Sequence, residues 1–131
     1  MKKLAMVLAI AVLGGCAATP HEFRPGDLRE PLYLRTERSI PLTFAQIQMA
    51  LFKHKATCGW GPEFVLDPNQ TAYATIYYKP GPTAEPNRTM IADLTFLANA
   101  PVRAQVYSYY ADVDEQVNQL FAAISHPTVC P

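Results

Sequence analysis

Residues 102–110 alternate between small apolar side chains and polar or aromatic ones, and this period of two constrains the fold more than any other feature. In a β-strand, side chains two positions apart point to the same face. Val102, Ala104 and Val106 are therefore predicted to face a core. The opposite face then carries Arg103, Gln105, Tyr107 and Tyr109. A strand with one covered face and one open face is typical of an antiparallel sheet.

Two segments have apolar residues at helical spacing instead. Thr43 and Gln46 match a capping box, in which each side chain bonds the backbone of the other residue. They predict a helix over about 44–55. A second helix is predicted to begin at Asp112 and to end at Pro127, because proline cannot continue a helix.

The other periodic segments predict strands, since they are rich in β-branched and aromatic residues. These segments are 32–39, 63–66, 71–79, 89–97 and 102–110. The order β-α-β-β-β-β-α predicts an α+β fold, with a single antiparallel β-sheet and two helices packed on one face. Over residues 32–126 this order resembles the TATA-binding-protein-like and helix-grip folds, in topology alone. Helix-grip modules occur in lipoprotein subunits of the outer-membrane barrel-assembly machine, so the resemblance implies an accessory role in envelope assembly.

The N-terminus has the layout of a secretory signal peptide. Lys2 and Lys3 precede an apolar run over 4–13, which is too short to span a bilayer. The segment Leu13-Gly14-Gly15-Cys16 resembles the lipobox of bacterial lipoproteins. That resemblance implies cleavage before Cys16 and attachment of a diacylglycerol, commonly with palmitate, to its thiol.

This processing divides the chain into three parts: a signal peptide (1–15), a lipidated Cys16 with a flexible tether (16–31), and an α+β domain (32–131). Ala17 resembles the outer-membrane class of lipoproteins, whereas the inner-membrane retention signal of that family is Asp at this place. The predicted location is the periplasmic face of the outer membrane.

With Cys16 acylated, two cysteines remain, and an oxidising compartment favours a Cys58–Cys130 disulfide. His54 and His126 each stand four residues before one of these cysteines, which leaves a tetrahedral zinc site as an alternative. Pro127 argues against it, because a helix cannot run on from His126 to Cys130. The prediction is a disulfide, no metal and no cofactor.

Charge and motifs exclude several function classes. Without Lys2 and Lys3, eleven acidic residues face nine basic ones, and no basic stripe predicts nucleic-acid binding. Nucleophile elbows, phosphate-binding glycine loops and zinc-protease motifs are missing from the sequence. Asp93 is expected on the open face of the sheet, but a single carboxylate is a weak active site. No catalytic residue is predicted, and the chain is predicted not to be an enzyme.

The predicted binding surface is the open face of the sheet. Tyrosine offers a large contact area at low conformational cost, so a face that mixes Tyr, Arg and Gln favours recognition. An ordinary solvent-facing sheet is the alternative. The candidate residues are Tyr77, Arg103, Gln105, Tyr107 and Tyr109, together with Trp60. Trp60 has two interpretations, an exposed anchor or a cover for the disulfide.

Two functional hypotheses follow. The first is a non-catalytic outer-membrane lipoprotein that binds the membrane through its acyl chains and recognises an envelope protein. The second is a small metal-handling protein or hydrolase of the envelope that uses His54 and His126. The second requires these histidines to converge with Asp93 or with two free thiols.

Overall fold

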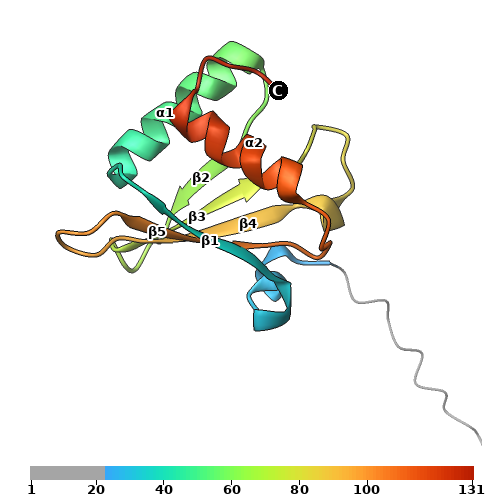
Figure 1. Cartoon of the computed structure of the whole chain (residues 1–131), viewed down its shortest axis with the longest axis horizontal. Coiled ribbons are helices and arrows are strands. Elements are labelled where there is room, and N and C mark those ends of the chain that lie inside the picture. The colour runs from blue at the N-terminus through green and yellow to red at the C-terminus, as the bar shows by residue number, and fades with distance from the viewer. Residues whose placement is uncertain (1–22) are drawn as a thin grey trace, which may run out of the picture.

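The structure, a computed structural model, describes residues 23–131 (Figure 1). The predicted signal peptide, Cys16 and the first part of the predicted tether lie outside these residues. The described chain contains the strands β1 (Leu34–Ile40), β2 (Glu63–Leu66), β3 (Tyr73–Tyr78), β4 (Met90–Thr95) and β5 (Val102–Tyr107), and the helices α1 (Phe44–Cys58) and α2 (Asp114–Ser125). It also contains the short 3-10 helices η1 (Pro25–Leu28), η2 (Pro31–Tyr33) and η3 (Pro86–Arg88). The predicted α+β class and element order are confirmed.

All five strands form one antiparallel sheet in the order β1-β5-β4-β3-β2. From β2 to β5 each strand pairs with the next one in the chain. β1 instead pairs with β5, the last strand. The segment that contains α1 therefore carries the chain from one edge of the sheet to the other.

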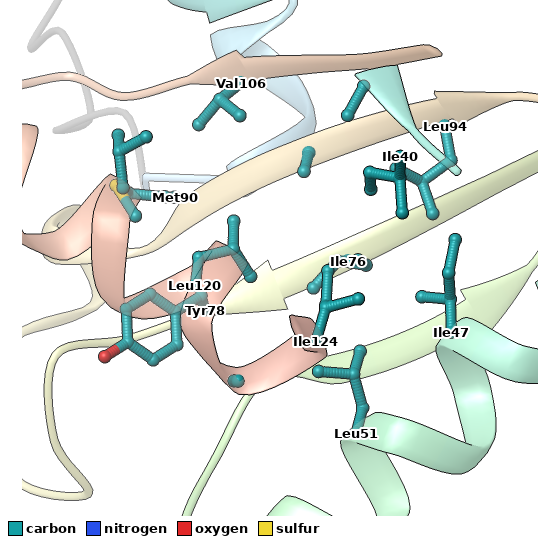
Figure 2. Close-up of a cluster of buried hydrophobic side chains, with 14 of the residues drawn as sticks. Ile40, Ile47, Leu51, Ile76, Tyr78, Met90, Leu94, Val106, Leu120 and Ile124 are labelled. Atoms are coloured by element: carbon teal, nitrogen blue, oxygen red, sulfur yellow. The ribbon is translucent and has the colours of Figure 1, made fainter. Parts of the chain in front are cut away.

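Both helices cover the same face of the sheet (Figure 1). The core lies between them and the sheet, and Figure 2 shows Ile76 and Tyr78 of β3 among the helix residues Leu51, Leu120 and Ile124. In β5, the residues Val102, Ala104 and Val106 are buried, as the alternation predicts. Each large side chain that leaves water in this layer stabilises the fold by roughly 1.5–3 kcal/mol.

The two helices begin differently. Thr43 and Gln46 form the predicted capping box at the start of α1, which then runs three residues further than predicted, to Cys58. It ends there because Gly59 adopts a left-handed conformation, with φ of 73°. The predicted start of the second helix at Asp112 is wrong. Val113 is the N-cap and makes no side-chain cap, so apolar burial positions this end instead.

Residues 23–33, which we name the strap, lie on the face of the sheet opposite to the helices (Figure 1). η1 contacts β4, and Leu28 at the end of η1 is only 1% exposed. Ile91 of β4 is equally buried, although it points away from the helices. The sequence predicts that the domain begins at residue 32, but the folded part begins earlier. The reason is that Leu28, in the predicted tether, packs against an apolar part of the sheet.

The predicted disulfide between Cys58 and Cys130 is confirmed, with 5.6 Å between the two Cα atoms. It joins the last residue of α1 to the C-terminal segment that follows α2. The 72-residue separation makes it a long-range link, which stabilises by roughly 4 kcal/mol in the chain-entropy model.

Candidate functional site

Side chains on the open face of the sheet line up across the strands, because residues paired in a ladder share a face. Thr75 of β3 pairs with Asp93 of β4, and Asp93 pairs with Gln105 of β5. Tyr73 and Tyr77 flank Thr75 on the same face of β3. These five residues help to line a hollow of about 590 Å³. Small-molecule sites fall in the range of roughly 300–1,000 Å³.

Arg29 of the strap closes one side of this hollow. Its Nε donates to Asp93 Oδ2 at 2.7 Å, and its Nη2 donates to Asp93 Oδ1 at 3.0 Å. Nη2 also donates to the Thr75 hydroxyl oxygen at 3.1 Å. The hydrogen bond with Asp93 raises the pKa of the Arg29 guanidinium above its usual value. This two-pronged geometry holds the strap in one position on the sheet.

The sequence reasoning missed Arg29, because it assigned the residue to a tether. A signal was present: Pro25 and Pro31 both stand at the first turn of a 3-10 helix, and Leu28 lies between them. Proline fixes φ and favours such a turn, so a proline-flanked leucine indicates a docked segment rather than a coil.

Arg103 lies on the open face of the sheet, as predicted, but it is engaged with β1. Its guanidinium donates to Glu37 Oε2 at 2.8 Å, and Gln105 donates to the same oxygen at 3.3 Å. The hydrogen bond from Arg103 lowers the pKa of Glu37. Both partners are about half exposed, so the pair is worth little in stability, and it orders the polar side chains on this part of the sheet.

Tyr107 and Tyr109 lead into a second group of side chains at the end of β5. Tyr109 stacks on Tyr33 with ring centroids 5.9 Å apart and meets Tyr110 edge-on at 5.3 Å. The Arg88 guanidinium lies 3.9 Å from the centre of the Tyr110 ring. We name Tyr33, Tyr109 and Tyr110 the aromatic cluster. Tyr107 lies on the open face between this cluster and the hollow and pairs with Ile91.

Trp60 does not belong to the open face. It lines a cavity of about 210 Å³ together with Cys58, Cys130 and His54. Its indole N–H donates to the carbonyl oxygen of Lys79 at 3.2 Å. Trp60 therefore takes the covering position beside the disulfide, one of its two predicted interpretations, and lies apart from the other candidate residues.

The histidines lie near the ends of the two helices. His54 is buried, and its Nδ1–H donates to the carbonyl oxygen of Pro127 at 3.0 Å. His126 is exposed at the end of α2. The thiols that the metal hypothesis needs are joined in the disulfide. Within residues 23–131, no three His, Cys, Asp or Glu residues come together as a metal site would require.

In comparisons with known proteins, no family model, no curated protein and no solved structure matches the chain. Among the described residues, no helix has the length and apolar character needed to span a membrane. We take the hollow on the open face as the candidate site. It is lined by Tyr77 and Gln105 of the predicted surface and by Arg29 and Asp93.

Proposed function

We propose that this chain is an outer-membrane lipoprotein on the periplasmic side. Acyl chains on Cys16 anchor it, and its domain is a non-catalytic module that binds a protein of the cell envelope. The basic start, the apolar run over 4–13 and the lipobox-like residues before Cys16 support the anchor. Two or three acyl chains suffice for stable membrane attachment.

The hollow on the open face is the observation that carries the binding role. Thr75, Asp93 and Gln105 project from paired strands, so the sheet holds these three polar groups in position. Tyr73 is 46% exposed and Tyr77 is half-buried, so both present aromatic surface to the hollow that Gln105 also lines. Aromatic residues with a few fixed hydrogen-bonding groups are the usual composition of a recognition site.

The same hydrogen bonds argue for binding rather than for catalysis. Both carboxylate oxygens of Asp93 accept hydrogen bonds from Arg29, and Oδ1 also accepts one from the Thr75 hydroxyl at 3.2 Å. An ionised Asp carboxylate has about four lone-pair sites, and these hydrogen bonds occupy three of them. Asp93 is therefore assigned to holding the strap and shaping the hollow.

The anchor is tested by growing cells that express the full chain with labelled palmitate. We expect the label in the chain and its loss in Cys16→Ser, which should also remain the size of the precursor. If the wild-type chain takes up no label, or if Cys16→Ser is cut to the mature size and fractionates like the wild type, the lipoprotein assignment is wrong.

The hollow is tested by placing a photo-crosslinking residue at Tyr73 or Tyr77 in cells. A matched control is Phe52, which is 72% exposed on α1, on the other side of the molecule. We expect one discrete crosslinked envelope protein from positions 73 and 77, weakened by Gln105→Ala, and none of it from position 52. The same pattern of products from all three positions would refute a specific site on the open face.

A further inference from the structure

The chain enters the described domain at one end of the sheet. Phe23 borders a cavity with Glu85, Pro86 and Asn87, next to η3. The amide of Asn87 donates to the Tyr110 hydroxyl oxygen at 3.0 Å, which links this entry point to the aromatic cluster. The β4–β5 hairpin lies at the opposite end of the sheet (Figure 1).

The length of chain before Phe23 limits which surface can approach the membrane. Six residues separate Cys16 from Phe23, and this segment spans at most about 25 Å when fully extended. A domain of this size is roughly 30 Å across, so a path around its surface to the far side takes about 50 Å. An acylated Cys16 therefore keeps the entry end toward the bilayer.

The surface at this end has the chemistry of a membrane interface. Leu32, beside Tyr33, is 71% exposed, and Tyr109 is 51% exposed. Two hydrogen bonds hold these segments together: the Ser108 N–H donates to the Tyr33 carbonyl oxygen, and the side-chain Nε of Arg35 donates to the Ser108 carbonyl oxygen. Tyrosine rings with polar tips and exposed leucines are suited to the boundary between headgroups and acyl chains.

We infer that Leu32 and the aromatic cluster form a membrane-docking surface, which we name the anchor-side surface, and that its occupant is the phospholipid interface beside the lipid anchor. This inference rests on the proposed acylation of Cys16. The anchor makes docking intramolecular, so weak contacts from a few side chains are sufficient. The contact is apolar in kind, because the exposed groups that carry it are a leucine side chain and tyrosine rings, which are uncharged.

The test attaches the mature chain, from Cys16 to Pro131, to vesicles without cellular acylation. With Cys58 and Cys130 in the disulfide, Cys16 is the only free thiol and couples to a maleimide-headgroup lipid in phosphatidylcholine vesicles. Phospholipids with a photoreactive acyl chain then label the residues they touch, which mass spectrometry maps. We expect several-fold more label at Leu32 and the aromatic cluster than at Phe52, although Phe52 is as exposed as Leu32.

Matched variants sharpen the result. Leu32→Ser with Tyr109→Ser should lose most of the lipid labelling, whereas Phe52→Ser should keep it, and anionic phosphatidylglycerol in the vesicles should leave it unchanged. Four outcomes would each overturn the inference. They are label concentrated on α1, uniform label over the whole surface, no label, and crosslinks between two copies of the chain. Palmitate uptake in cells tests the anchor separately, so failure of either claim is recognised without the other.

Discussion

The burial of Leu28 gives the sharpest prediction about this fold, because it decides whether the strap belongs to the domain. Leu→Ala at a buried position costs about 2–5 kcal/mol, depending on how far the surroundings collapse. The strap lies on the surface of the sheet and can settle around a shorter side chain, so we expect Leu28→Ala to cost about 2 kcal/mol, the low end of that range. A change of that size increases the population of released strap by about 30-fold.

Trypsin cleavage after Arg29 measures this population. While Asp93 holds the guanidinium of Arg29, the bond to Glu30 cannot enter a protease site, so cleavage follows the fraction of strap that is released. We expect Leu28→Ala to be cut about 30-fold faster than the wild type. Leu32→Ala is the control beside the same bond, since Leu32 is largely exposed and its loss changes stability by less than about 0.5 kcal/mol. Equal cleavage rates for the two variants would refute a docked strap.

Three further predictions concern the helix-bearing side of the sheet. Cys58→Ser, which leaves Cys130 unpaired, should lower the free energy of unfolding by roughly 2–4 kcal/mol in urea titrations, and an unchanged midpoint would contradict it. Burial raises the pKa of the Tyr78 hydroxyl. The stability that this group contributes is therefore present below its ordinary pKa of about 10 and is lost as the pH rises through the raised value. Tyr78→Phe should make the fall of Tm at alkaline pH less steep. Gly61→Ala should cost about 1–3 kcal/mol, because a Cβ there meets the ring of buried His54 at 2.8 Å; a wild-type Tm would show that the ring moves freely.

The layered fold was predictable because each of its elements carries a strong local signal. The alternation over 102–107 is satisfied by burial of one face, and the Thr43–Gln46 capping box places the start of α1 correctly. Strand order was not predictable in the same way. The pairing of β1 with β5 depends on which edge the chain reaches after α1, and no local pattern in the sequence encodes that path.

The candidate site was predictable only in part, for a related reason. Strand periodicity places Tyr77, Gln105 and Asp93 on one face, but it carries no information on what lies over that face. Arg29 reaches Asp93 across 64 positions of sequence, and such a contact follows from the docking of Leu28 rather than from spacing. Trp60 had two open interpretations for a similar reason, since a single aromatic residue between glycines has the same local pattern whether it is exposed or packed beside a disulfide.

The strap connects the two proposals physically. With the strap docked, an acylated Cys16 is at most about 25 Å from the point where the chain enters the domain. With the strap released, the free chain runs from Cys16 to Leu34, and its extended length is about 60 Å. Release also removes Arg29 from the edge of the hollow, so in the proposed lipoprotein the hollow is complete only while the domain is held close to the membrane. A partner that fills the hollow and contacts Arg29 therefore favours the docked strap, and by linkage it favours the membrane-proximal position of the domain. Binding in the hollow should accordingly slow trypsin cleavage after Arg29, and a partner that leaves this rate unchanged does not use the Arg29 side of the hollow.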